Sequence, residues 1–295
     1  MLLRRLPLFC CLFVLSLLLP SMAAAQREGD AALRTELEQA YNVWRQAMAR
    51  GDARTWAGSI TRYRQTMVRN AIVSERLPFP AAVFAANAPL PAIENLRLLE
   101  VQAVGETAHL VYFGKIDLGQ DRELVKDNLL KLKFGRENGA WRYDSNRITS
   151  LDNAPDTRKT LQAGGAPDFL DTPEYTPPGS LPPVPALCRV PDHKGGYKIE
   201  SFGYETTVSM NGFDSAPVED GLDQQVIIGG LVNGRNEMTL HIKPVTVPKG
   251  AKPSLQIRVY TLSSSSPEPV AEVLRWTAPE GGAPKTVTLP FTVKP

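Results

Sequence analysis

Cysteine and histidine are scarce in this chain. Its 295 residues include only three cysteines and three histidines. The sequence contains no C-x-x-C, H-E-x-x-H, G-x-S-x-G, G-x-G-x-x-G or P-loop pattern. These absences exclude the motif-bearing redox dithiols, zinc proteases, serine hydrolases and nucleotide-binding folds. We therefore predict no cofactor and no metal site.

An apolar N-terminal segment predicts export. Arg4 and Arg5 precede an apolar run over residues 6–19, and three alanines follow at residues 23–25. This order is typical of a secretory signal peptide, here residues 1–25. The apolar run is shorter than the roughly 20 residues that a membrane span needs. We expect a periplasmic or secreted protein with no stable membrane span after cleavage.

Loss of the signal peptide would also change the net charge and the number of cysteines. The chain has 33 basic and 31 acidic residues, and two of the basic residues lie in the signal peptide. The mature chain is then neutral overall, which argues against a nucleic-acid partner. Cys188 would be the remaining cysteine, so the fold must be stabilised by packing without an internal disulfide.

Two amphipathic helices are predicted at the start of the mature chain. Over residues 30–50 the apolar residues recur every three or four positions, as on one face of a helix. These residues are Leu33, Leu37, Tyr41, Trp44 and Met48. The same spacing recurs after Asp52, at Trp56, Ile60, Tyr63 and Met67. Together they predict a helical hairpin, and a short helix is expected over residues 81–86.

Alternating apolar residues then predict four antiparallel strands joined by short turns. The expected strands are residues 97–104, 108–118, 124–134 and 140–148. An Asn-Gly turn at residues 138–139 is a strong hairpin signal. The segment 26–150 is therefore expected to be an α+β domain.

This segment resembles the NTF2-like superfamily. The resemblance rests on the hairpin Trp44…Arg50-Gly51-Asp52…Trp56 and on the later run Asn138-Gly139-Ala140-Trp141-Arg142-Tyr143. It implies a helical hairpin packed on a strongly curved antiparallel sheet that forms a cone with a pocket. Members of the superfamily include isomerases, dehydratases and domains without catalytic activity.

The rest of the chain is expected to contain a linker followed by an all-β domain. Residues 151–185 contain eight prolines and predict an extended linker. Residues 186–295 predict an all-β sandwich and resemble immunoglobulin-like and jelly-roll modules. The seven expected strands are residues 197–202, 206–210, 224–228, 237–242, 255–262, 270–276 and 286–293.

The candidate catalytic residues are His109, Asp117 and Asp127. His109 and Asp117 share one face of their expected strand, and Asp127 lies on the next strand. An acid–base pair inside an apolar cone could abstract a proton from, or hydrate, a small apolar substrate. The same residues could equally be solvated at strand ends.

Four aromatic residues of the C-terminal domain are candidate ligand-binding residues. They are Tyr197, Tyr204, Tyr260 and Trp276. Exposed rings on a sheet can stack on sugars, whereas buried rings fill a sandwich core.

The favoured interpretation is an exported, non-catalytic binding or scaffolding protein of the cell envelope that contacts another protein or a polysaccharide. Two alternatives remain open. One is an isomerase-type or dehydratase-type enzyme that uses the N-terminal pocket. The other is carbohydrate binding by the C-terminal sandwich.

Overall fold

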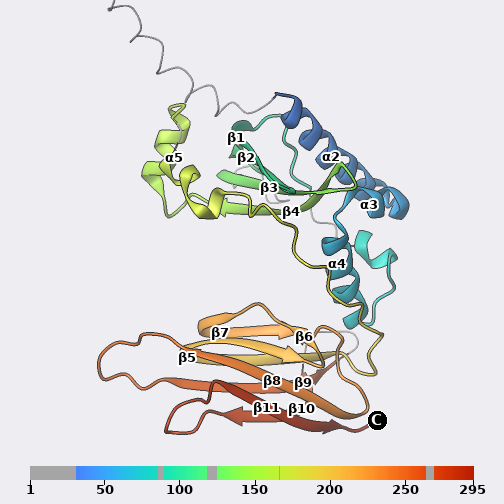
Figure 1. The fold of residues 1–295 in the computed structure, drawn as a ribbon, viewed down its shortest axis with the longest axis vertical. Helices are drawn as coiled ribbons and strands as arrows, with labels where there is room; N and C mark the ends of the chain where they lie inside the picture. The colour runs from blue at the N-terminus through green and yellow to red at the C-terminus, as the bar shows by residue number, and fades with distance from the viewer. Residues whose placement is uncertain (1–30, 86–89, 118–124, 166, 264–268) are drawn as a thin grey trace, which may run out of the picture. The chain divides into compact units, whose positions relative to one another are not determined.

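The computed structural model describes residues 31–85, 90–117, 125–165, 167–263 and 269–295. The expected signal peptide lies outside this range. The chain is an α+β protein with antiparallel sheets, and it divides into two compact units (Figure 1). Unit 1 comprises residues 1–61 and 88–182, and unit 2 comprises residues 62–87 and 183–295. These bounds differ from the consecutive domains expected from the sequence, because residues 62–87 belong to unit 2.

The first predicted helix of unit 1 is confirmed. Helix α2 (Ala31–Arg50) ends at Gly51, which has a φ of 65°, and α3 (Ala53–Ser59) follows. Asp52 caps α3, since its Oδ1 accepts hydrogen bonds from the backbone N–H groups of Arg54 and Thr55 at 3.1 and 3.0 Å. The turn residues therefore fix where one helix ends and the next begins.

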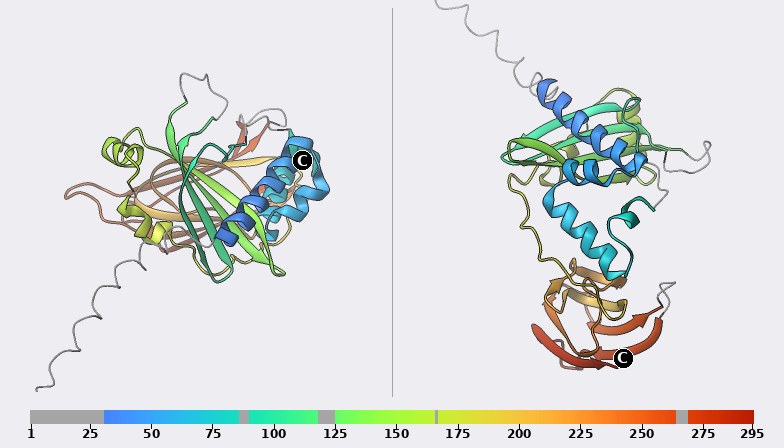
Figure 2. Two further views of the ribbon diagram at one scale, coloured as in Figure 1. Left: turned by 90° about the horizontal axis from the view of Figure 1, so that it is seen from above. Right: turned by 90° about the vertical axis from the view of Figure 1, so that its right-hand side faces the viewer.

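The four predicted strands of unit 1 are also confirmed, and they pair antiparallel in chain order. They are β1 (Arg97–Val104), β2 (Thr107–Lys115), β3 (Asp127–Glu137) and β4 (Ala140–Ser150). Leu110 and Tyr112 of β2 are buried with Leu37 and Tyr41 of α2 in one core cluster. Figure 2 shows α2, in blue, on one side of the green strands. The helix side chains thus occupy this face of the sheet.

The expected linker is partly folded, which corrects the sequence interpretation. It contains α5 (Pro155–Gln162) and the short 3-10 helices η3 (Asp168–Asp171) and η4 (Pro173–Tyr175). Leu161, Leu170 and Tyr175 are buried against the sheet face opposite α2. Proline is compatible with a first helical turn, and two of the eight prolines, Pro155 and Pro173, begin α5 and η4.

The second predicted helix is broken, which is a further correction. Ile60 is extended, with φ −112° and ψ 149°, and it forms a parallel bridge with Tyr143 of β4. Thr61 continues the pairing, because its N–H donates to the Tyr143 carbonyl at 2.9 Å and its Oγ1 donates to Asp144 Oδ1 at 2.7 Å. Pairing with β4 therefore replaces helical hydrogen bonds at this point, and α4 (Arg62–Ser74) begins in unit 2.

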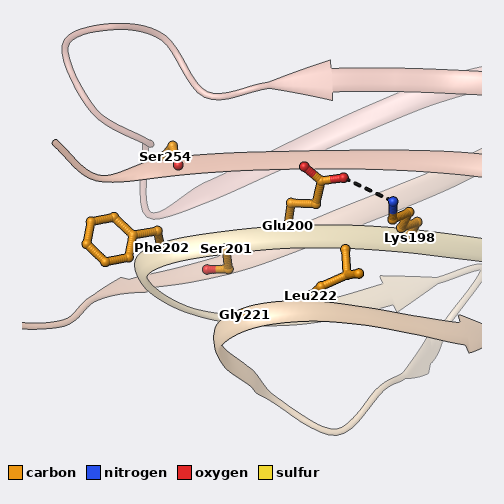
Figure 3. A pocket seen from close by; sticks show the side chains of 7 residues that line it. All are labelled: Lys198, Glu200, Ser201, Phe202, Gly221, Leu222 and Ser254. Atoms are coloured by element: carbon orange, nitrogen blue, oxygen red, sulfur yellow. Dashed lines mark ion pairs between the residues drawn. The ribbon is translucent and has the colours of Figure 1, made fainter.

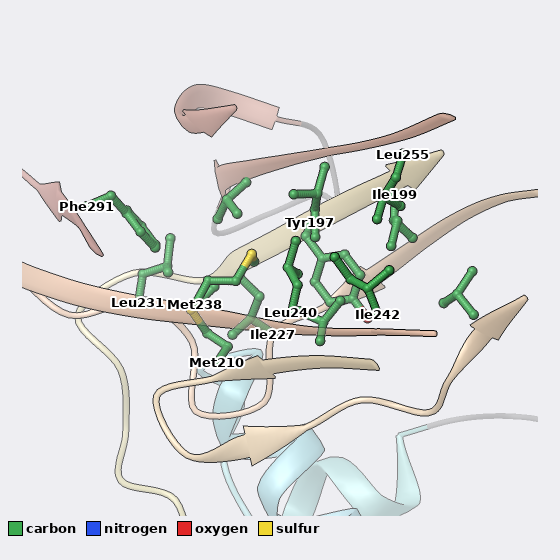
Figure 4. Packing of buried hydrophobic residues seen from close by; sticks show 14 of the residues in the cluster. Tyr197, Ile199, Met210, Ile227, Leu231, Met238, Leu240, Ile242, Leu255 and Phe291 are labelled. Atoms are coloured by element: carbon green, nitrogen blue, oxygen red, sulfur yellow. The ribbon is translucent and has the colours of Figure 1, made fainter. Parts of the chain in front are cut away.

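Unit 2 contains a seven-stranded antiparallel sheet with the path β10-β9-β5-β8-β11, and β6 and β7 also pair with β5. Its strands are β5 (Gly195–Met210), β6 (Phe213–Asp214), β7 (Val218–Val226), β8 (Gly234–Pro244), β9 (Ser254–Leu262), β10 (Pro269–Thr277) and β11 (Thr286–Val293). The ends of the path, β10 and β11, contact each other, so the sheet is nearly barrel-shaped. Its interior holds a continuous apolar core (Figure 4).

Strand β5 joins two strands that the sequence predicted separately. Residues 195–202 pair with β9, and residues 204–210 pair with β8. Gly203 lies between these halves with a φ of 78°, and a Cβ there would lie 2.6 Å from Val247. Glycine thus allows one long strand to change partners.

Buried polar side chains connect α4 to the rest of unit 2. Asn70 Oδ1 accepts from the backbone N–H of Cys188 at 3.0 Å, and Asn70 Nδ2 donates to the Ala186 carbonyl at 2.8 Å. Ser74 Oγ accepts from the N–H of Gly229 at 2.7 Å. Asn70 and Ser74 are 1% and 0% exposed. Residues 62–74 are therefore an integral part of unit 2. The short 3-10 helix η1 (Ala81–Phe84) follows, where a short helix was expected.

Candidate functional site

The three predicted catalytic residues do not come together. His109 is buried, and its Nε2 lies 2.9 Å from Oε2 of Glu100 on β1. Asp117 is exposed beyond the end of β2. Asp127 is opposite Lys115 of β2. Lys115 lies six residues along β2 from His109, so Asp127 and His109 are roughly 20 Å apart along the strands. The partner of His109 is thus Glu100, which the sequence argument did not consider.

The surroundings of His109 are closed by the segment that follows β4. Lys131 is 9% exposed, and its Nζ donates to the Glu174 carbonyl and lies 4.8 Å from the ring centroid of Tyr175. Burial lowers the pKa of Lys131. Because Tyr175 and Leu170 pack over this sheet face, the polar groups lie beneath a structural cover. Among the described residues, His109 Nε2 has a partner in Glu100, whereas the buried Nδ1 of His109 has no hydrogen-bond partner.

The four predicted aromatic residues do not form one exposed row. Tyr197 and Tyr204 are 3% and 5% exposed and belong to the core of unit 2. The Tyr204 hydroxyl accepts from the backbone N–H of Ala283 at 3.1 Å. Trp276 is half-buried against the same core. Tyr260 is half-buried and alternates with the buried Val259, so it points outward from β9.

Tyr260 belongs to an outward surface that we call the polar face. It consists of outward side chains of β7, the first half of β5, β9 and β10, and strand register aligns them in three cross-strand rows. The rows are Leu222–Glu200–Gln256–Thr277, Gln224–Lys198–Arg258–Arg275, and Val226–Gly196–Tyr260–Glu272. Most of these side chains are polar or charged. Inward neighbours such as Ile199 and Ile257 are 0% exposed, which establishes the two faces of the strands.

Hydrogen bonds and ion pairs fix several side chains of the polar face. Lys198 Nζ lies 3.2 Å from Glu200 Oε1. Arg258 donates from Nε and Nη2 to Gln256 Oε1, at 2.9 and 2.6 Å. Arg275 donates from Nε and Nη2 to the two carboxylate oxygens of Glu272, both at 2.8 Å. This pairing lowers the pKa of Glu272, so Glu272 stays ionised at neutral pH.

One end of the polar face is hollowed (Figure 3). The hollow has a volume of about 390 Å³ and is lined by Lys198, Glu200, Ser201, Phe202, Gly221, Leu222 and Ser254. Phe202 and Leu222 are 38% and 64% exposed. Figure 3 shows the Lys198–Glu200 ion pair along β5 from Phe202. The hollow therefore offers apolar surface beside charged and hydroxyl groups.

Aromatic residues lie at both ends of this surface. Phe202 is opposite Ser254, and Tyr260 lies six residues further along β9, about 20 Å away at strand spacing. Sequence reasoning selected Tyr260 but missed Phe202 and the rows. The alternation of Leu255, Ile257 and Val259 with polar residues could have indicated a polar face of β9, although not its partners.

A second hollow lies within unit 1, between α2, α3 and the turn before β4. Its volume is about 430 Å³, and Glu36, Gln39, Val43, Ser59 and Trp141 are among its lining residues. Arg136 lies over the Trp141 ring, with its Cζ 5.7 Å from the centroid. This open groove is separate from the buried surroundings of His109.

Comparison with known proteins provides no family assignment. No family model, no curated protein and no solved structure matches the chain. Among the residues that the structure describes, no group of three or more His, Cys, Asp and Glu could hold a metal ion. The described helices also include none with the length and apolar character to cross a membrane.

Proposed function

We propose that this is an exported, non-catalytic binding protein whose polar face binds a polysaccharide. The observation that carries the proposal is the set of aligned rows of hydrogen-bonding side chains, with aromatic rings about 20 Å apart at the two ends. Hydroxyl-rich polymers are bound by such donors and acceptors together with ring stacking.

The composition of the polar face favours a polysaccharide over a protein partner. The centres of protein interfaces are depleted in Lys and Glu and rich in apolar and aromatic groups. The middle of the polar face instead contains Lys198 and Glu200, beside Gln256. These side chains can exchange hydrogen bonds with a hydrated polymer without burying a large apolar area.

The surroundings of His109 support binding in preference to catalysis. His109 is hydrogen-bonded to Glu100, and both aspartates considered as its partners lie elsewhere. On one sheet face the space expected for a substrate contains α2 side chains, and on the other it contains Leu170 and Tyr175.

We also propose the finer fold assignment expected from the sequence. The order of two helices and a four-stranded meander supports an NTF2-like arrangement for unit 1. The partner change within β5 supports a sandwich for unit 2, of the kind in which one strand passes from one packed sheet to the other, and we assign it to the immunoglobulin-like and jelly-roll modules that the sequence resembles.

The double variant Phe202→Ala/Tyr260→Ala tests the proposed function. We expect its polysaccharide affinity to fall about tenfold or more, because a lost ring contact is worth roughly 0.5–1.5 kcal/mol beyond its buried area. Binding is measured by affinity electrophoresis and titration calorimetry against soluble dextran, galactomannan and polygalacturonate.

Leu187→Ala is the matched control, because Leu187 is a 64% exposed apolar side chain of unit 2 outside the polar face. This variant should bind as the wild type does. The proposal fails if the wild type binds none of the polymers, or if the double variant binds as tightly as the control.

A further inference from the structure

Three cations lie directly opposite one another on adjacent strands of the polar face. Lys198 of β5 is opposite Arg258 of β9, and Arg258 is opposite Arg275 of β10. We call these residues the cationic row. The strand neighbours of Lys198 and Arg258 are buried, and those of Arg275 are partly buried against the core of unit 2, so all three side chains point to the outer side.

This arrangement is unfavourable for the sheet itself. Like charges directly opposite each other on neighbouring strands destabilise a sheet. Glu200 pairs with Lys198, and Glu272 pairs with Arg275. Arg258 instead donates to the neutral Gln256. Glu272 also attracts Arg258 electrostatically, but three cations and two carboxylates still leave the row and its partners with one net positive charge.

A chain of hydrogen bonds orients the Arg258 side chain. Gln256 Nε2 donates to Thr277 Oγ1 at 3.1 Å, while Gln256 Oε1 accepts from Arg258 Nε and Nη2. A guanidinium has five N–H donors, so these two contacts leave three. A guanidinium in fixed orientation is well suited to bind a carboxylate, because its planar fork matches the two oxygens.

Acidic groups limit this cationic region to one half of the surface. Glu205, Glu219 and Asp220 lie beyond the bend of β5 at Gly203, where Glu205 is opposite Glu219. Asp220 Oδ1 accepts from the Gly203 N–H, and Glu205 pairs with Lys243 of β8. The cationic row lies on the other side of Phe202, among residues 196–202 and their partners.

We propose that the polysaccharide bound by the polar face is anionic and that Arg258 binds one of its carboxylates. This inference rests on the proposed function and specifies its ligand class. Lys198 and Arg275 contribute to the attraction of the polymer, and Phe202 and Tyr260 contact its sugar rings. In the bound state, carboxylates of the ligand supply negative charge beside the like-charged row.

The test compares polygalacturonate with uncharged dextran of similar chain length, for the wild type, Arg258→Gln and Lys243→Gln. Lys243 is the charge-matched control, because it is a 72% exposed cation of unit 2 outside the polar face. The wild type should bind polygalacturonate at least about tenfold more tightly than dextran, and Arg258→Gln should lose about that factor. Lys243→Gln should keep the preference, and added salt should weaken it.

The outcomes separate this inference from the proposed function. Equal binding of both polymers by the wild type, weakened by Phe202→Ala/Tyr260→Ala, would leave the proposed function standing and overturn the inference. An unchanged preference in Arg258→Gln would overturn it as well. Tighter binding of single-stranded DNA than of polygalacturonate would assign the cationic row to another polymer and also overturn it.

A second variant, Lys198→Gln, separates ligand binding from a structural role. We expect weaker polygalacturonate binding with a melting temperature that is unchanged or higher, since the variant removes a like charge opposite Arg258. A lower melting temperature with unchanged binding would show that the row serves stability and would overturn the inference.

Discussion

Replacing Tyr41 by alanine should lower the free energy of unfolding of unit 1 by about 3–5 kcal/mol, the range for truncating a large buried aromatic residue. Tyr41 is 0% exposed, and its ring centroid lies 5.6 Å from that of Trp44 and 5.4 Å from that of Tyr143. Its hydroxyl donates to the Pro91 carbonyl at 2.7 Å. The variant thus removes both a core contact between α2 and β4 and a buried hydrogen bond.

Two further variants separate the contribution of the Tyr41 ring from that of its hydroxyl. Tyr41→Phe keeps the ring and should cost about 1 kcal/mol, because the Pro91 carbonyl still accepts from Arg45 Nη1 at 3.4 Å. Val43→Ala, at an exposed position of the same helix, should change stability by less than about 0.5 kcal/mol. Denaturant unfolding gives the free energies, and hydrogen exchange should show lost protection in α2 and β4. Equal losses for Tyr41→Ala and Tyr41→Phe would contradict this packing of α2.

Replacing Asn70 by alanine should destabilise unit 2 by about 2–4 kcal/mol, since each polar group left unpaired on burial costs about 1–3 kcal/mol. The Asn70 amide satisfies both the N–H of Cys188 and the carbonyl of Ala186. It also accepts from Arg69 Nη1 at 3.2 Å. No helical propensity can compensate for the loss of these long-range contacts, so residues 183–191 should separate from α4.

The Cys188 thiol provides a local readout for this variant. Cys188 is 3% exposed, so it should react slowly with a thiol reagent in a chain that begins after residue 25, where it is the remaining cysteine. Asn70→Ala should speed this reaction, whereas Gln65→Ala on the same helix should not. Slow labelling of Asn70→Ala at wild-type stability would show that α4 is not held in unit 2 by this amide.

The local periodicity of the sequence predicts most of the secondary structure. The helical pattern expected over residues 30–50 corresponds to α2 (Ala31–Arg50), and the alternation after residue 97 forms β1 to β4 close to the expected bounds. Local patterns mispredicted the structure where a backbone segment packs against a distant part of the chain. Ile60 fits the helical spacing, but Ile60 and Thr61 pair with β4. The proline-rich residues after 151 supply the buried Leu161, Leu170 and Tyr175.

The candidate site was harder to predict for the same reason. Tyr260 was selected from the sequence by its ring, and it does point outward. The sequence did not predict Arg258 as a binding residue, because its role depends on Lys198 and Arg275 being opposite it. Those residues are separated from it by 60 and 17 positions in the chain, and register across three strands is not encoded in any single segment.

The sequence by itself determined the α+β class and nearly all strands, because alternation and helical spacing are properties of consecutive residues. Only the tertiary structure decided that α4 belongs with unit 2, that His109 pairs with Glu100, and that three cations share one row. Each of these depends on which distant segments pack together. That choice is made by burial and hydrogen bonding summed over the whole unit, which no local pattern contains.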